Sequence, residues 1–339
     1  MMSAAAPHAH APVLLFDRSS RLRLQFSGPK AAESLTGLVT NDVLALRGGD
    51  GLYACALTPK GRVIADVRIL GIAGADGTVE SFLADANATA GVGFFAMIRK
   101  YVNPRLAKYI DVSASTSCLT LVGAGATEVL RQCGADAAVV DALIAAPLFT
   151  HRVVALGDIR VRLVRVPDLG LDVVFDLHVD HAAADALRAA LRAAGAEPAN
   201  DIEWQRRRVI AGRPEWGLDM DESTLAQEAN MDALQAISYK KGCYTGQETV
   251  SRVHFRGHVN RTLRRVTYAD DAAPAVGTPL SAPDSNAVGD ARSTVIDNDG
   301  SRVGIAMLRR EVTDGATLSW VDADGSAHAL TVVGAPDEG

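Results

Sequence analysis

The 339-residue sequence has few cysteines, no long apolar run and no excess of positive charge. Its four cysteines, Cys55, Cys118, Cys133 and Cys243, are far apart and form neither a CxxC pair nor a metal-ligand spacing. This scatter is typical of a reducing compartment, and we expect no resident metal. No apolar stretch approaches the ~18–20 residues that span a bilayer, and the N-terminus lacks the basic start of a signal peptide. We therefore expect a cytoplasmic protein that does not associate with membranes.

Positive charge is also limited, because the formal net charge is −6. A protein that coats nucleic acid usually presents a strongly basic face, so direct nucleic-acid binding is not expected. The length and the 48% hydrophobic composition allow two or three domains with their own cores. Nothing in the sequence requires an assembly larger than a monomer.

Several catalytic patterns are missing, among them Walker A, GxSxG and HExxH. The run VGAGATE after residues 118–122 is similar to the start of a dinucleotide site, but Glu128 stands at the third glycine position. We predict a plain turn before a helix there. His254 and His258 are four residues apart, but Gly257 and the surrounding positive charge argue against both a helix and a metal site. We assign both histidines to a basic surface.

The spacing of apolar residues predicts a mixture of helices and strands. Strands are predicted at 21–26, 61–70, 118–122, 159–166 and 171–176, with a bulge near Val164. Helices are predicted over about 87–101, over 181–194, and after Ser27–Pro29, where one face carries Ala31, Leu35, Leu38, Val39 and Val43. From about residue 261, short β-type runs between turn residues predict a small barrel or sandwich. The fold class is therefore α+β with an all-β C-terminal part.

The most informative segment is YKKGCYTGQETVSR at 239–252, which combines cations, a thiol, an amide and a carboxylate. Gly242 and Gly246 allow a tight turn or a close approach to a ligand. Residues 240–265 contain seven Lys or Arg residues against the single acid Glu248. A local cationic zone on an acidic chain predicts an anionic partner. The alternative is a solvated surface with no specific role.

Cys243 has two interpretations that the sequence weighs about equally. It can be a small apolar side chain packed beside a turn, as free cysteines often are. It can also be a reactive thiolate, because the nearby Lys240 and Lys241 would lower the pKa of its thiol. One cysteine alone cannot hold an iron–sulfur cluster, so at most it would be one ligand of a shared or transient site.

The run KGCYTGQE at 241–248, followed by Arg252, resembles the signature of the YgfZ family of folate-binding proteins. That family is related to the T-protein of the glycine cleavage system. Residues 35–67, LTGLVTNDVLALRGGDGLYACALTPKGRVIADV, are similar to the N-terminal pattern of both, and VGTPL at 276–280 is similar to the start of the family's barrel. The resemblance covers about residues 13–335.

This resemblance implies an α+β, T-protein-like ring of three domains around a folate-sized hole. Two interleaved α+β domains would occupy residues 13–260, with internal breaks near residues 52, 115 and 200. A C-terminal antiparallel β-barrel would occupy 261–335, and residues 1–12 would be a disordered leader.

The resemblance further implies a tetrahydrofolate-binding accessory factor for the maturation or repair of iron–sulfur proteins. Its partners would be a reduced folate and iron–sulfur client proteins such as a tRNA-thiolating enzyme, so its effect on tRNA modification would be indirect. The alternative is a folate-dependent aminomethyltransferase or another one-carbon transferase.

The sequence departs from the T-protein pattern at the acids. Where the T-protein pattern has two adjacent acids, this sequence has Ala65 and Asp66, so one acid remains. Leu171 stands where the T-protein pattern has the glutamate that holds the pterin. A carboxylate suits the pterin because its N3–H and 2-amino group form a two-donor edge. Asp66, Asp168 and Glu248 are the remaining candidates for that contact.

The resemblance supplies a set of candidate site residues. Cys243 and Asp66 are the catalytic candidates. Lys241 and Arg252, together with Arg256, would attract the anionic glutamate tail of folate. The full set of cofactor-binding candidates is Lys241, Gly242, Tyr244, Gly246, Gln247, Glu248, Arg252, Tyr53 and Arg165.

Overall fold

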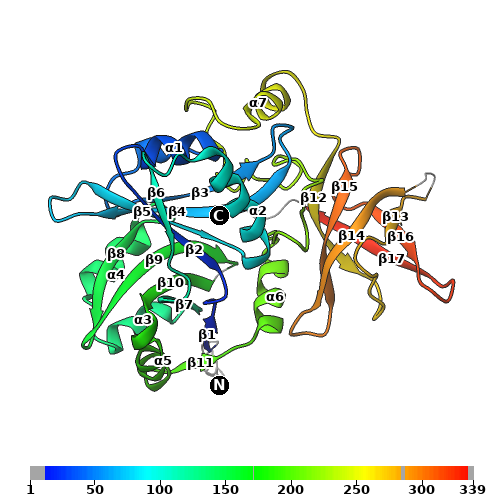
Figure 1. Ribbon diagram of the computed structural model, residues 1–339. Helices are drawn as coiled ribbons and strands as arrows, with labels where there is room; N and C mark the ends of the chain where they lie inside the picture. The colour runs from blue at the N-terminus through cyan, green and yellow to red at the C-terminus, as the bar shows by residue number, and fades with distance from the viewer. Residues whose placement is uncertain (1–11, 171, 284–286, 335–339) are drawn as a thin grey trace, which may run out of the picture. The chain divides into compact units, whose positions relative to one another are not determined.

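The computed structural model describes residues 12–170, 172–283 and 287–334, which form two compact units (Figure 1). The first unit combines the described residues up to Ser19 with Ala114–Asn200. The second combines Ser20–Ser113 with the described residues from Asp201 onward, so the chain crosses between the units three times. The predicted leader lies almost wholly outside the described residues. The predicted domain boundaries near 52, 115, 200 and 260 stay predictions.

The first unit is a mixed sheet with helices packed on one face. Its strand order is β11-β1-β7-β10-β9-β8, antiparallel except for the β1–β11 pair. The core forms where Leu119 and Phe175 of the sheet meet Leu187 and Leu191, which lie one helical turn apart. The elements are β1 (Val13–Asp17), β7 (Thr116–Val122), α3 (Ala126–Gln132), α4 (Ala137–Ala145), β8 (His151–Leu156), β9 (Ile159–Leu169), β10 (Asp172–Asp180), η2 (His181–Ala183), α5 (Ala184–Ala193) and β11 (Ala196–Pro198).

The second unit begins with an antiparallel sheet of strand order β3-β4-β5-β2-β6. Its core includes Leu24 and Phe26 of the sheet and Phe94 and Ile98 of a helix. The elements are β2 (Leu22–Ser27), α1 (Ala31–Leu38), η1 (Val43–Ala45), β3 (Gly51–Leu57), β4 (Val63–Ala73), β5 (Val79–Ala86), α2 (Ala88–Tyr101), β6 (Lys108–Asp111), α6 (Asp201–Ile210) and α7 (Gln247–Arg256).

The same unit ends in a closed antiparallel barrel of strand order β12-β15-β14-β13-β16-β17, drawn from yellow to red in Figure 1. Closure through the β12–β17 pair satisfies the backbone groups that an open sheet edge would leave exposed. The barrel consists of β12 (Arg261–Tyr268), β13 (Pro279–Ser281), β14 (Ala287–Ile296), β15 (Arg302–Arg309), β16 (Thr317–Val321) and β17 (Ala327–Gly334). The predicted α+β class with a C-terminal barrel is confirmed.

Three local predictions are wrong. The first helix ends at Leu38, because Val39 is extended (φ −118°, ψ 162°) and bridges Ala56, while Val43 starts a separate short turn. No register shift occurs at Val164, which pairs regularly on both sides; the irregularity lies between Asp172 and Val174. His254 does lie on a helix, since α7 runs to Arg256 and ends before Gly257.

Other predictions agree with the structure. Helix α2 follows Asn87, whose side chain accepts the Thr89 N–H as an N-cap. The VGAGATE run is a turn between β7 and α3. In the described residues, no helix is both long and apolar enough to cross a membrane.

Candidate functional site

The chain that leads into the 239–248 segment is fixed to strand β3. The Thr40 hydroxyl donates to the Ala236 carbonyl at 2.6 Å and accepts the Cys55 N–H at 2.8 Å. The Asn41 amide donates to the Tyr53 carbonyl at 2.9 Å. The same amide donates to the Gln235 carbonyl at 2.9 Å, so Thr40 and Asn41 both join strand β3 to the residues just before the motif.

Lys241 is buried and binds the end of helix α1. Its Nζ donates to the carbonyl of Thr36 and, at 2.6 Å, to that of Val39. These are carbonyls that a helix end leaves without an intrahelical partner, and a cation is favourable there. The same ammonium lies 4.3 Å from the centroid of the Tyr244 ring.

Burial lowers the pKa of Lys241 to about 8, with a smaller opposing effect from Asp42 and Cys243. The ammonium is therefore committed to helix α1. Arg252, the other cation predicted to attract a folate tail, is exposed.

Gly246 is required by a close contact between two turns. Its φ is +85°, and a Cβ there would lie 2.6 Å from the Thr58 carbonyl oxygen and 3.3 Å from Gly61 Cα. Gly61 has φ +75°, and a Cβ there would lie 2.9 Å from Thr249 Cβ. The β3–β4 hairpin tip therefore packs against the start of α7, which only glycine at these positions allows.

Gly242 and Cys243 differ from their neighbours because both are exposed. A Cβ on Gly242 would meet nothing within 4 Å, and its φ lies outside the left-handed region. Of the four cysteines, Cys55 and Cys118 are buried, and Cys133 is half-buried with a pKa raised by burial. The interpretation of Cys243 as a buried packing residue is therefore wrong, since its thiol faces solvent.

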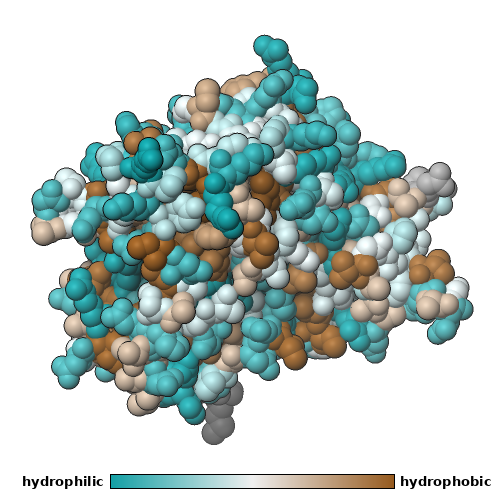
Figure 2. All heavy atoms as spheres, in the orientation of Figure 1, coloured by the Kyte–Doolittle hydropathy of each residue, from teal (hydrophilic) through white to brown (hydrophobic). Residues whose placement is uncertain are grey.

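The motif continues into α7, which is anchored by one apolar residue. Val250 is buried, and its carbonyl accepts the Gln227 amide at 2.8 Å. Gln247 is half-buried, whereas Glu248 and Arg252 are exposed. Figure 2 shows hydrophilic side chains over the region where α7 lies in Figure 1.

Asp66 forms a pair with Tyr53 on neighbouring strands β4 and β3. The Tyr53 hydroxyl donates to Asp66 Oδ2 at 2.9 Å. Within the described residues, the other oxygen, Oδ1, is buried without a hydrogen-bond partner. Burial raises the pKa of the Asp66 carboxyl, opposed chiefly by Arg21, and burial also raises the pKa of the Tyr53 hydroxyl. A ligand with N–H donors would satisfy Oδ1.

The motif and the Asp66 pair belong to the second unit and are joined through its core. Cys55 lies directly opposite Asp66 in the β3–β4 ladder and packs in the same cluster as Tyr244 and Val250. Among the predicted site residues, Arg165 instead belongs to the first unit, where it donates to Asp168 Oδ2 at 2.8 Å. Asp168 Oδ2 is therefore paired, whereas its Oδ1 is buried without a hydrogen-bond partner within the described residues. Leu171 lies outside the described residues.

A group of potential metal ligands in the first unit escaped the sequence analysis. Cys118 of β7 is opposite His178 of β10, and Asp176 lies two residues earlier on the same face. Their donor atoms lie within 4.8 Å of one another, and these residue types suit zinc. The signal was missed because the ligands come from two strands. All three also take part in further contacts, including a hydrogen bond from Thr120 to Asp176.

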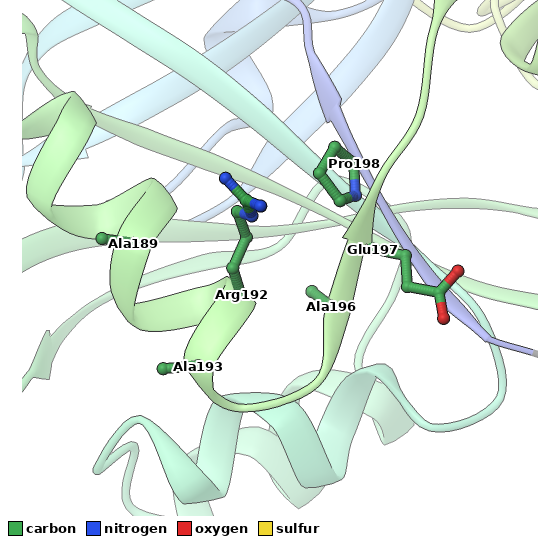
Figure 3. Close-up of a pocket in the computed structure, with 6 residues that line it drawn as sticks. All are labelled: Ala189, Arg192, Ala193, Ala196, Glu197 and Pro198. Carbon is green, nitrogen blue, oxygen red and sulfur yellow. The ribbon is translucent and has the colours of Figure 1, made fainter.

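A shallow surface hollow lies between α5 and β11 of the first unit (Figure 3). Its charged side chains, Arg192 and Glu197, point in different directions. The remaining lining is aliphatic, from Ala189, Ala193, Ala196 and Pro198. This hollow lacks the convergent polar groups expected of a specific ligand site.

Comparisons with known proteins agree on one family. The model of the GCVT N-terminal domain matches residues 2–241. An iron-sulfur cluster assembly factor IBA57 homolog, mitochondrial, from Pyricularia oryzae is 31% identical over 88% of this chain and 72% of its own. A tRNA-modifying protein YgfZ from Klebsiella pneumoniae is 26% identical over 80% of this chain and 77% of its own.

A solved structure shares the fold. The glycine cleavage system aminomethyltransferase T from Bartonella henselae superposes with a TM-score of 0.82 at 20% identity. The match covers 97% of this chain and 87% of that one. At this identity the likeness concerns the fold alone.

The contact at Gly246 predicts a sharp difference between two glycines of the motif. Gly246→Ala is expected to lower the free energy of unfolding by about 1–3 kcal/mol, because it adds left-handed strain and a clash with a carbonyl. Gly242→Ala is the matched control and is expected to change it little. Denaturant midpoints of the two variants would test this, and equal midpoints would contradict the contact.

The burial of Lys241 predicts a pH-dependent effect on stability. Lys241→Met is expected to cost about 1–3 kcal/mol by leaving buried carbonyls unpaired, whereas Lys240→Met, at the exposed neighbour, is not. The folded-state pKa of Lys241, about 8, lies below its usual value of 10.5, so between these values the unfolded chain binds more protons. Wild type should therefore gain stability over Lys241→Met as pH rises from 8 to 10.5. Urea midpoints across that range would show it, and a gap that shrinks would refute the burial.

Proposed function

Because the chain belongs to the GCVT N-terminal domain family, we propose that it is a tetrahydrofolate-binding accessory factor for iron–sulfur proteins. The family predicted from KGCYTGQE is confirmed by the match and by the two relatives. Their names connect them with iron–sulfur cluster assembly and tRNA modification. The finer statement, that this chain binds a reduced folate and serves iron–sulfur clients, is the proposal.

One observation carries the proposal: Cys243 is exposed while its flanking residues are firmly held. Lys241 and Tyr244 are buried on either side of it, and Gly246 fixes the next turn. A thiol presented in this way can reach an iron atom, a sulfur species or a one-carbon unit without rearrangement of the chain. Exposed Arg252 supplies positive charge for an anionic folate tail.

Asp66 is the acid that we assign to the pterin. Its Oδ2 is held by Tyr53, which leaves the buried Oδ1 to accept an N–H donor. Asp168 also has a buried, unsatisfied Oδ1, but its Oδ2 is paired with Arg165 and it belongs to the first unit, whereas the motif belongs to the second. Glu248 is exposed on α7. The binding of two pterin donors at a carboxylate would also offset the cost of burying it.

Calorimetry with tetrahydrofolate tests this assignment. Asp66→Asn is expected to weaken binding about tenfold or more, because a hydrogen bond to a charged group contributes about 1.5–3 kcal/mol. Glu248→Gln serves as the control and should bind like wild type. If Glu248→Gln lost binding while Asp66→Asn kept full affinity, the pterin contact would be assigned to Glu248 instead. A wild-type protein indifferent to reduced folates would overturn the proposed function.

The role of the thiol is tested in cells that lack the gene. Iron–sulfur enzyme activities are expected to fall on deletion and to recover with wild type but not with Cys243→Ser. Cys133→Ser changes a half-buried thiol of the first unit and should restore activity. Full recovery with Cys243→Ser would remove the thiol from the mechanism.

A second candidate function is aminomethyl or other one-carbon transfer. The observation that favours it is the retained Asp66, whose raised pKa suits a group that exchanges a proton with a folate amine. Turnover of an aminomethyl-loaded lipoyl carrier protein that depends on Asp66 would select this function over the first. Cytoplasmic location stays a prediction, and the name of one relative places that protein in mitochondria.

A further inference from the structure

Helix α7 and the residues before it form a surface that extends beyond the residues assigned to the folate site. We define the α7 surface as Lys240, Cys243, Arg252, Phe255 and Arg256, all of which are exposed. Phe255 leaves 65% of its surface in contact with solvent. Cys243 lies four residues before the first residue of α7, Gln247, so the thiol and the helix are parts of one continuous segment.

The cations of the α7 surface are unpaired. In the part of the chain that the structure describes, Lys240, Arg252 and Arg256 form no ion pair. Elsewhere in the same unit, Arg208 pairs with Asp219 at 2.6 Å and Arg261 pairs with Glu228 at 3.0 Å. Positive charge thus stays unneutralised on the segment that carries Cys243, in a chain whose net charge is −6.

Phe255 is held outward by other rings. The Tyr239 and His254 rings stack with centroids 3.6 Å apart, and Phe255 meets both edge-on, at 5.9 Å and 4.7 Å. Tyr239 is itself fixed, because its hydroxyl donates to Asp232. A supported aromatic side chain loses little conformational freedom on binding, which is a property of residues that dominate protein interfaces.

We propose that the α7 surface docks an acidic protein partner, with Phe255 entering an apolar hollow and the partner's carboxylates meeting Lys240 and Arg256. Docking there brings the partner's surface to the segment that carries Cys243. This inference rests on the proposed function, for which it names the chemistry of the protein that receives or delivers the reactive group.

The charge pattern favours a protein over a nucleic acid. Nucleic-acid binding uses a broad basic face that contacts many phosphates. The α7 surface offers three cations, and the acid Glu248 lies exposed on the same helix. A few cations around one apolar anchor match the composition of a protein interface, where aromatic residues and arginine are enriched.

Fluorescence anisotropy tests the proposal with a labelled peptide in which glutamates flank two leucines. Wild type should bind it about tenfold more tightly than the matching peptide with glutamines, because several exposed ion pairs together contribute on this scale. Lys240→Glu/Arg256→Glu should lose that preference, and Phe255→Ala should weaken binding of both peptides. Arg160→Glu/Arg192→Glu reverses two exposed cations of the first unit and should behave like wild type.

Three outcomes would overturn the proposal. They are equal affinity for the two peptides, an unchanged preference in Lys240→Glu/Arg256→Glu, and displacement of the acidic peptide by transfer RNA at lower concentration than by unlabelled peptide. Tetrahydrofolate calorimetry on Phe255→Ala, which changes no residue assigned to the folate site, separates this result from the proposed function. Unchanged folate affinity with lost peptide binding supports a distinct docking role, whereas absent folate binding in wild type defeats the folate proposal alone.

Discussion

The burial of one ammonium group against the end of a short helix organises the candidate site. Lys241 joins the motif to Thr36 and Val39, which lie more than two hundred residues earlier in the chain. Helix α1 ends where these carbonyls turn toward the lysine, and the chain then continues as the extended residue Val39. Burial of a cation is costly unless it finds several acceptors, and here two carbonyls and an aromatic ring supply them.

This constraint explains the alternation of buried and exposed residues in KGCYTGQE. Lys241 and Tyr244 face inward, Gly242 and Cys243 face outward, and Gly246 allows the hairpin between β3 and β4 to approach. The same hairpin strands carry Tyr53 and Asp66, so one arrangement positions both the thiol and the buried acid. The thiol segment and the acid therefore depend on a shared core rather than on a direct contact.

Much of the fold could be predicted from the sequence, because alternation and turn residues are local signals. The barrel, helix α2 and the Leu187–Leu191 helix follow from such signals. Helix α7 could not, since Gly246 and Gly257 flank a mostly polar segment whose helical form depends on the burial of Val250. The residues of the motif were found, but the role of Lys241 was not. Its charge is visible in the sequence, whereas its burial depends on a helix distant along the chain.

The unequal exposure of the four thiols has a practical consequence. Cys55 and Cys118 are shielded by the protein, and Cys133 combines partial burial with a raised pKa. A maleimide dye added briefly to the native protein would therefore attach first at Cys243, since thiolate character and access govern such reactions. Wild-type protein thus offers a natural attachment point for an optical reporter, without engineering of the remaining cysteines.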